Sequence, residues 1–346
     1  MNQSYSQDWT PLHDQLHQTL RQRKLLPKNQ RILIAVSGGQ DSLCLTKLLL
    51  DLQSKWNWYL AIAHCDHKWR PDSEANANYV KKLAINWQLP FYLETANKIY
   101  KSEAEARKWR YQTLNKIALE SNFLYIVTGH TASDRAETLL YNLIRGSGTD
   151  GLQALTWQRP LTESFSPLLV RPLLEISRTQ TGNFCQEQKI RIWEDSTNQD
   201  LHYARNRIRL ELFPILRQFN PQAELALAQT AEILSAEVEY FDNETEKLLE
   251  KVTEVDINNF NISQLEEQPV RYIINRLVLR EAPLALQRRV MRNILHKLLP
   301  TNPNFSHIEK LTALINSPNR SQTDPFPGGA IAKVQHPWII LVSRVC

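Results

Sequence analysis

The sequence predicts an α/β fold in which a Rossmann-like parallel sheet is followed by a second, mainly helical C-terminal domain. Between residues 31 and 145, short apolar runs alternate with longer segments of helical pattern, and the apolar runs are continuous. Continuous apolar strands are buried on both faces, as they are in a parallel sheet that helices cover. A chain of 346 residues is long enough for two domains.

Each element follows from a local pattern. Thr10 can cap an opening helix over residues 10–25, Pro11 suits its first turn, and leucines recur at a spacing of four. RILIAV (31–36) is the first buried strand, and a glycine turn leads from it into an apolar helix. Strands and helices then alternate. The further strands are 59–64, 91–95 and 124–130, and the helices are 43–52, 73–88, 103–121 and 132–145.

The character of the sequence changes near residue 220. We therefore predict a catalytic domain over residues 1–220 and a mainly helical domain over residues 221–346. In the second, residues 223–252 indicate one long helix, residues 268–299 a helical stretch with exposed arginines, and the last apolar segments a terminal hairpin.

Composition excludes several classes of protein. With 42% apolar and 22% charged residues, the chain has the balance of a folded globular protein. No apolar run approaches the roughly 20 residues that span a bilayer, and the N-terminus lacks a signal core, so we expect no membrane association. Four scattered cysteines without a CxxC pair indicate neither a zinc ribbon nor a dithiol redox site, and they favour a reducing, cytoplasmic compartment.

The net charge of +5 is unevenly distributed. Residues 1–220 hold 28 basic and 21 acidic residues (net +7), residues 221–267 hold 2 and 12 (net −10), and residues 268–346 hold 11 and 3 (net +8). Two basic regions around an acidic one fit a protein that holds a polyanion with two surfaces. A solvated helical face explains the pattern about equally well.

Six of only nine glycines fall in three short turns, and the first turn carries the clearest motif. SGGQDS (Ser37 to Ser42) follows a buried strand and opens a helix, where unpaired backbone N–H groups form an anion site. Gly38 and Gly39 let a phosphate approach the backbone. Asp41 would repel a bare phosphate, so its presence indicates Mg²⁺. The loop is neither a Walker A motif nor a GxGxxG fingerprint.

Two motifs follow the second and third strands. HCDHKWR (His64 to Arg70) lacks the standard zinc spacings, so a loop lining the nucleotide is favoured over a zinc site. SEAEARKWRY places Arg107 and Arg110 three residues apart on one helical face. A solvated helix with ion pairs is the alternative interpretation of that second motif.

The fourth strand leads into GHTASDRAET. His130, Asp134 and Glu137 follow one another at helical spacing, and two acids and an imidazole beside a phosphate loop are costly without a cation. Mg²⁺ and a substrate ammonium are the natural candidates. RGSGTDGL then predicts a flexible lid, while EDSTN (194–198) and RNRIR (205–209) follow, and the guanidinium groups of RNRIR suit RNA phosphate.

SGGxDS resembles the pyrophosphate loop of the N-type ATP pyrophosphatases, the PP-loop superfamily. In order, HCDHxxR, EAxARxxRY, GHxxxDxxET, RGSGxxGL, RPLL (171–174), WEDx[ST]N and RNxxR resemble the motifs of the tRNA(Ile)-lysidine synthetases. The resemblance is dense over residues 31–220 and loose beyond residue 221. It implies an adenine nucleotide alpha hydrolase-like fold in the shorter, two-domain form of the family.

The resemblance also implies a reaction. ATP adenylates the C2 oxygen of the wobble cytidine in a tRNA(Ile) with a CAU anticodon, and the ε-amine of L-lysine then displaces AMP to give lysidine. ATP and Mg²⁺ are the implied cofactors, and a homodimer is left open. The implied residues are Asp41, Arg110, His130, Asp134 and Glu137 for catalysis; Ser37, Gly38, Gly39, Gln40, Asp41 and Ser42 for ATP; Glu137, Asp134 and Arg110 for lysine; Arg205, Arg209, Arg288, Arg289 and Arg292 for tRNA; Asp41 and Asp134 for the metal.

Three rival interpretations can be distinguished. A tRNA thiolase of the same superfamily needs catalytic cysteines or an iron–sulfur cluster, and no CxxC is present. An amide-forming ligase with a glutaminase partner, such as NAD or GMP synthetase, does not explain the basic C-terminal region. A non-catalytic, nucleotide-gated RNA-binding protein would not turn over ATP when tRNA and lysine are present.

Overall fold

The computed structural model describes residues 9–69, 71–100, 102–162, 167–193, 199–253 and 270–342. The chain divides into two compact units, Met1–Ser235 and Ala236–Cys346, and each is described by itself. The division falls inside one long helix, α10 (Ala223–Thr253), whereas the sequence-based boundary was placed before that helix begins. Within these described ranges, no helix has both the length and the apolar character that crossing a membrane requires.

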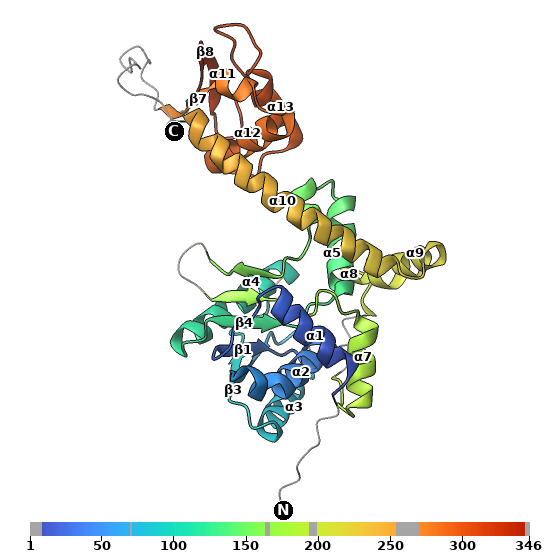
Figure 1. Ribbon diagram of the computed structural model, residues 1–346. Helices are drawn as coiled ribbons and strands as arrows, with labels where there is room; N and C mark the ends of the chain where they lie inside the picture. The colour runs from blue at the N-terminus through green and yellow to red at the C-terminus, as the bar shows by residue number, and fades with distance from the viewer. Residues whose placement is uncertain are drawn as a thin grey trace, which may run out of the picture. The chain divides into compact units, whose positions relative to one another are not determined.

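The first unit is built on a six-stranded sheet with the order β3-β2-β1-β4-β6-β5. Strands β1, β3 and β4 of this sheet are labelled in Figure 1. Neighbouring strands run parallel except β5, which is antiparallel to β6. The four predicted strands are confirmed. The short strands β5 and β6 were not predicted, because a strand of three residues carries too little pattern. The strands are β1 (Arg31–Ala35), β2 (Tyr59–Asp66), β3 (Phe91–Thr95), β4 (Tyr125–Thr128), β5 (Gln158–Pro160) and β6 (Leu168–Val170).

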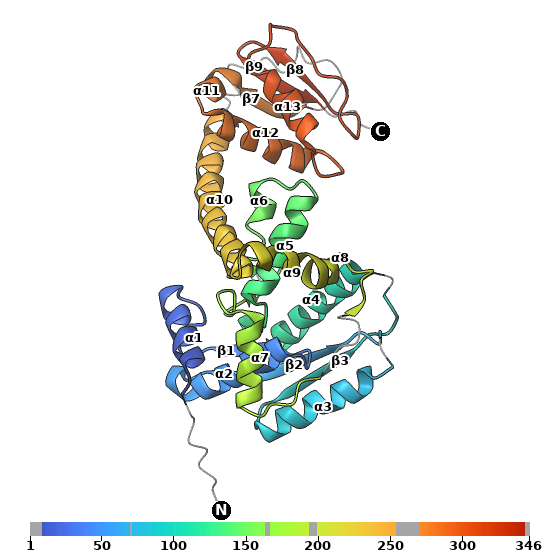
Figure 2. The same cartoon turned by 90° about the vertical axis from the view of Figure 1, so that its right-hand side faces the viewer.

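Helices cover both faces of this sheet, as Figure 2 shows. On one face, leucines of α1 and α2 pack with Val80 of α3, Phe184 of α7 and the alternate strand residues. On the other face, Leu114 and Ile117 of α4 pack against Leu33 of β1 and Ile126 of β4. The helices are α1 (Pro11–Gln22), α2 (Gln40–Trp56), α3 (Ser73–Asn86), α4 (Glu103–Glu120) and α7 (Arg178–Glu187).

A helical subdomain adjoins the sheet within the same unit. Ala136 and Leu139 of α5 pack with Ile208, Phe213 and Ala231, so α5 lies between the sheet and the helices that follow it. The chain here contains a π-helical turn, a feature often found at functional sites. The elements are α5 (Ala132–Ile144), α6 (Thr149–Leu152), α8 (Ala204–Arg207), the π-helical turn η2 (Ile208–Leu212), α9 (Phe213–Phe219) and the first part of α10.

The second unit combines helices with a three-stranded antiparallel sheet of order β7-β9-β8. The predicted terminal hairpin is confirmed as β8 (Ile331–Gln335) and β9 (Trp338–Val342). The prediction of helix throughout 268–299 was wrong at its start: β7 (Val270–Asn275) is a strand, since its β-branched run can pair with β9. The remaining helices are α11 (Arg276–Arg280), α12 (Leu284–Leu298) and α13 (Phe305–Ala313).

Candidate active site

The sheet order places the candidate site. Strand order reverses between β1 and β4, and ligands of open parallel sheets bind outside the carboxyl ends of the strands at such a switch point. SGGQDS follows β1, and Gly129 and His130 follow β4. A Cβ atom on Gly129 would lie only 2.7 Å from the backbone oxygen of Asp41, so the two loops are in direct contact.

The phosphate loop has the shape of an anion site. Gly38 has φ +92°, and a Cβ there would lie 2.3 Å from Oδ1 of Asn76, so only glycine fits. Helix α2 begins after Gly39 without a side-chain cap, which leaves the first backbone N–H groups available to a phosphate. Ser42 Oγ accepts from the Ser37 backbone N–H at 3.2 Å and donates to the Gly39 carbonyl at 2.9 Å. The Ser42 hydroxyl therefore also fixes the shape of the loop.

Asp41 is held by the start of helix α7. Its Oδ1 accepts a hydrogen bond of 2.5 Å from Thr181 Oγ1, and the Arg178 guanidinium lies 3.6 Å from Oδ2. Burial, opposed by Arg178 but assisted by the charge of Asp134, raises the pKa of Asp41 to about 6. Arg178 and Thr181 were missed in the sequence; the capping box at Ser177, S-x-x-Q, was the available signal for a helix beginning there.

Asp134 caps the helix that carries it. Its Oδ2 accepts from the Thr131 backbone N–H and hydroxyl, both at 2.8 Å. Burial alone would raise the pKa of Asp134, but His130, the Thr131 backbone and Arg178 together hold it below the ordinary value. His130 precedes the helix and shares a 2.8 Å hydrogen bond with Thr128 Oγ1. Burial lowers the pKa of His130 to about 3, so its imidazole is neutral near pH 7.

Glu137 is buried at 2% exposure on the same helix. Arg209 of η2 clamps it with two hydrogen bonds, Nε to Oε1 at 2.6 Å and Nη2 to Oε2 at 2.8 Å. Burial still raises the pKa of Glu137, although this hydrogen-bonded clamp opposes the rise. Arg209 also lies 3.7 Å from Asp134. The structure therefore places Arg209, which we expected at tRNA phosphate, next to the carboxylates of Asp134 and Glu137.

The remaining predicted arginines lie in different places. Arg110 points toward the crevice end of β2, where its charge acts on Cys65 and His67. Arg205 lies 3.9 Å from Glu103 at the start of α4. In the second unit, Arg288 makes a bidentate pair with Glu309 and Arg289 a 2.7 Å pair with Asp242, while Arg292 follows one turn later on α12.

The HCDHKWR motif gives no zinc geometry. His64 Nδ1 bonds to the Val36 carbonyl oxygen at 2.7 Å, and His67 packs edge-on against Trp109 with ring centres 5.0 Å apart. In the described ranges, no group of three or more His, Cys, Asp and Glu is arranged to hold a metal ion. Arg70 of this motif and the predicted EDSTN segment (194–198) lie outside the described residues.

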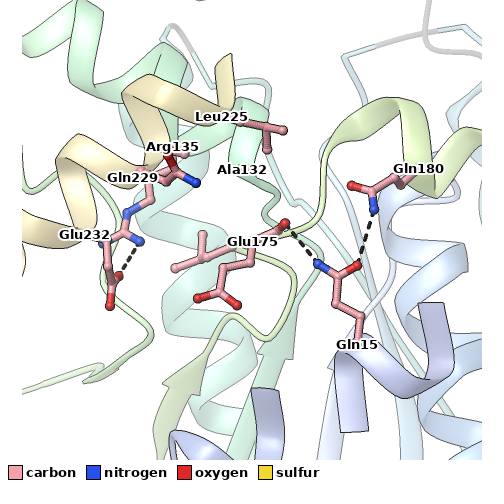
Figure 3. Close-up of a pocket in the computed structure, with 10 residues that line it drawn as sticks. Gln15, Ala132, Arg135, Glu175, Gln180, Leu225, Gln229 and Glu232 are labelled. Carbon is pink, nitrogen blue, oxygen red and sulfur yellow. Dashed lines mark hydrogen bonds and ion pairs between the residues drawn. The ribbon is translucent and has the colours of Figure 1, made fainter. Parts of the chain in front are cut away.

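A separate cavity of about 370 Å³ is lined by α1, α5, α7, α10 and the segment before α7 (Figure 3). Arg135 pairs there with Glu232 at 2.6 Å, and the Gln15 amide bonds to the Glu175 carbonyl oxygen and to Gln180, each at 3.3 Å. None of the predicted site residues lines this cavity, so it is distinct from the crevice at the sheet.

Two family models match this chain. One, described as a PP-loop domain, covers residues 10–216, and the other, a TilS substrate binding domain, covers residues 275–336. A tRNA(Ile)-lysidine synthase of Nostoc sp. is 66% identical over 96% of this chain and 97% of its own length. The chain belongs to the tRNA(Ile)-lysidine synthase family. A second member, from Synechocystis sp., is 49% identical over 94% of this chain and 96% of its own length.

A solved structure outside the tRNA(Ile)-lysidine synthase family supports the fold. A U34-tRNA thiolase from Methanococcus maripaludis superposes with a TM-score of 0.54 at 15% identity, covering 65% of this chain and 78% of the thiolase. At that identity the likeness concerns the α/β fold alone. The match of both family models and of relatives over nearly their full length favours the lysidine synthase assignment over the thiolase one.

Proposed function

We propose that this protein ligates L-lysine to C2 of the wobble cytidine of a tRNA(Ile) with a CAU anticodon. In the first step the cytidine C2 oxygen attacks the α-phosphorus of ATP, and pyrophosphate leaves. In the second step the lysine ε-amine attacks C2 and AMP departs with the oxygen. Family membership and the PP-loop domain support the enzyme class and the use of ATP.

One observation carries the residue assignments: an uncapped phosphate loop and a pair of carboxylates meet at the switch point of the sheet. The loop from Ser37 to Ser42 leads into a start of α2 without a side-chain cap, which supports binding of the pyrophosphate of ATP there. Asp134 and Glu137 stand beside it and share one guanidinium, that of Arg209. A guanidinium on these carboxylates marks a place that accepts cationic groups, which supports binding of the lysine ammonium there.

The second step needs an uncharged amine. Lysine arrives as an ammonium, so a carboxylate has to take its proton before the attack on C2. Burial raises the pKa of Glu137. Burial acts in the same direction on Asp134, but His130, the Thr131 backbone and Arg178 hold the pKa of Asp134 below its ordinary value. A carboxylate with a raised pKa is the better proton acceptor of the two, which supports Glu137 in that role and Asp134 as a fixed negative charge.

Mg²⁺ fits the donor set of the site. Asp41 and Asp134 supply hard carboxylate oxygens, and the charge of Asp134 contributes to the raised pKa of Asp41. A cation between the loop and the phosphates would relieve this repulsion. Bound Mg²⁺ would supply charge neutralisation of the pyrophosphate leaving group. Asp41 and Asp134 would hold it, together with phosphate oxygens.

The sulfur-transfer alternative finds little support in the cysteines. Cys44 and Cys185 are buried, and burial raises the pKa of Cys44 strongly. Burial also raises the pKa of Cys65 to about 12. A thiolate is the reactive form of cysteine, so these thiols are poorly suited to transfer sulfur.

We further propose that residues 1–220 carry catalysis, that residues 221–346 bind tRNA, and that the protein works in the cytoplasm. The TilS substrate binding domain supports the second assignment. A homodimer is compatible with all of this, and light scattering would decide it.

The deciding experiment uses radiolabelled lysine. Purified protein, ATP and Mg²⁺ are incubated with tRNA(Ile) transcript bearing a CAU anticodon, with methionine tRNA as the control. Acid-precipitable label on the first RNA alone is expected. Pyrophosphate release without lysine incorporation would keep the adenylating chemistry and refute lysine as the nucleophile.

A further inference from the structure

Four arginine side chains from three separate segments surround one tyrosine on helix α4. The guanidinium carbons of Arg107, Arg110 and Arg159 lie 5.2, 5.5 and 5.5 Å from the centre of the Tyr111 ring. Arg171, directly after β6, adds a fourth charge, and this residue is only 2% exposed. We call these five residues the Tyr111 cluster.

The Tyr111 cluster has more hydrogen-bond donors than the described protein groups around it satisfy. Throughout the described ranges, none of its arginines forms an ion pair with a carboxylate, although neighbouring Arg205 does. Tyr111 Oη and Arg171 Nε are both buried without a hydrogen-bond partner. Arg171 approaches the tyrosine hydroxyl without hydrogen-bond geometry, and its Nη1 bonds instead to the Thr156 carbonyl oxygen at 2.6 Å. Buried donors that lack partners are rare and call for a ligand.

The positive charges of the arginines in the Tyr111 cluster repel one another. Burial lowers the pKa of Arg171 to about 10, and the charges of Arg159 and Arg107 add to the effect although Tyr111 opposes it. Burial would raise the pKa of Tyr111, but Arg107, Arg110 and Arg171 bring it below the ordinary value. An anion among the guanidinium groups would relieve their repulsion and accept hydrogen bonds from the unpartnered donors.

The cluster borders the candidate active site. Burial lowers the pKa of His130 and Asp134 opposes this effect. The charges of Arg171, Arg110 and Arg107 lower that pKa further, so these arginines lie near His130. The crevice therefore has two parts of opposite character beside His130. One contains the carboxylates of the phosphate loop and α5, and the other contains the four arginines around Tyr111.

Aromatic rings adjoin the arginines. The charge of Arg110 acts on the ring of His67, whose pKa burial and this charge lower to about 4. The Trp109 ring centre lies 5.0 Å from that of His67 and 5.7 Å from that of Tyr100. His67 in turn lies 5.8 Å from Trp69. Planar rings next to guanidinium groups are surfaces on which unpaired nucleobases stack, whereas a free carboxylate or a pyrophosphate needs no such surface.

We propose that the Tyr111 cluster binds a phosphodiester group of single-stranded RNA next to the target cytidine, with a flanking base on the neighbouring aromatic rings. This rests on the proposed function and extends it to the substrate backbone. A lysine carboxylate needs one guanidinium fork, and four arginines exceed that need. The phosphates of ATP are assigned to the uncapped start of α2.

The test measures RNA binding without turnover. A CAU anticodon stem–loop is titrated against the full chain, in the absence of ATP and lysine, over a series of salt concentrations. Arg159→Gln and Tyr111→Phe are the test variants, since neither residue has been assigned a role in the chemistry. Arg31→Gln is the matched control, because Arg31 also lies over a tyrosine, Tyr59 at 4.1 Å, but at the amino end of β1.

Arg159→Gln should weaken RNA binding several-fold. The plot of log affinity against log salt should become less steep by about 0.7, the value for one single-strand phosphate contact. Tyr111→Phe should weaken RNA binding without lowering the melting temperature, because the hydroxyl it removes has no partner in the free protein. Arg31→Gln should bind RNA like the wild type. RNA affinities of all three variants equal to wild type would overturn the proposal.

A second set of measurements distinguishes RNA from lysine and ATP as the ligand of the Tyr111 cluster. If Arg159→Gln raises the KM for lysine or ATP while RNA binding stays unchanged, the cluster serves one of those ligands and the proposal is wrong. Failure of the proposed function is distinguishable, because it would abolish lysine incorporation by the wild type while the RNA titration could still be performed. A loss of RNA affinity confined to the cluster variants supports the phosphodiester site under either outcome.

Discussion

Arg209 donates both of its lateral N–H groups to the two carboxylate oxygens of Glu137. The two residues are separated by 72 positions and come from η2 and α5. Glu137 is buried, whereas Arg209 is partly exposed, so the arginine is the partner with solvent to move into when the pair opens. A lysine ammonium that bound at Glu137, as we propose, would compete with Arg209, and this competition is the basis of the first prediction.

Glu137→Ala should still form the adenylated tRNA but transfer lysine at least 100-fold more slowly, a loss typical of a missing proton acceptor. Labelled AMP bound to RNA reports the first step, and labelled lysine the second. The change also leaves Arg209 half-buried without its partner, so Glu137→Gln, which keeps an acceptor oxygen, is the control for stability. Full lysine incorporation by the alanine variant would refute the assignment.

Asp41→Ala should abolish lysine incorporation while tRNA binding persists, because the carboxylate lies at the phosphate loop and is not among the arginines proposed to bind tRNA. Filter binding of labelled tRNA and lysine incorporation are measured on the same preparation. Asp41→Asn keeps an acceptor for Thr181 and serves as the control for local structure. Normal turnover by either variant would remove the proposed metal role.

The raised pKa of Asp41 gives the fold a pH dependence of definite sign. With a pKa of about 6 when folded and 3.8 as its ordinary value, the folded protein binds more protons between these pH values. Its stability should therefore fall as pH rises from about 4 to 6, by at most about 3 kcal/mol from this group. Urea titrations of wild type and Asp41→Asn at both pH values check this. An identical pH dependence in the two proteins would contradict it.

Glu232 holds two arginines and a tryptophan together. It accepts from Arg135, Arg23 and Trp157, and Arg135 is almost completely buried. Glu232→Ala should lower the free energy of unfolding by about 3 kcal/mol, because it leaves a buried guanidinium without its charge partner. Glu211→Ala removes the exposed partner of Arg207 and should change stability by less than about 0.5 kcal/mol. Similar losses for both variants would show that burial of the pair is immaterial.

Reversing the charge of Arg288, Arg289 and Arg292 together should weaken tRNA binding and flatten its salt dependence. Two of these arginines already hold carboxylates, so Arg288→Glu combined with Glu309→Arg is the informative control. It restores the ion pair while it moves the positive charge to α13. An unchanged salt slope in the triple variant would count against this part of the tRNA surface.

The sequence was sufficient for the elements around the phosphate loop, because each buried strand and its following turn is a local pattern. RILIAV and SGGQDS needed no distant partner to be interpreted. The strands β5, β6 and β7 were missed, since they are short and their pairing depends on residues elsewhere in the chain. β7 pairs with β9, whose partner residues lie more than 60 positions away.

The partners of the site residues could not be predicted for the same reason. Arg178 and Thr181 reach Asp41 from about 140 residues away, and RNRIR gave no sign that Arg209 would face a carboxylate. Charge and spacing predicted the kind of group at each position. The pairing of the groups depends on how α5, α7 and η2 pack, which is a property of the tertiary structure.

The contact between Gly129 and Asp41 has a consequence for how the protein tolerates mutation. A single methyl group at position 129 would push the first turn of α2, so one substitution would damage the nucleotide loop and the carboxylate helix at once. Gly148 has nothing within 4 Å of where its methyl group would stand. In a population of randomly mutated genes, alanine at 148 should survive selection, whereas alanine at 129 should disappear as completely as a change in the reacting groups themselves.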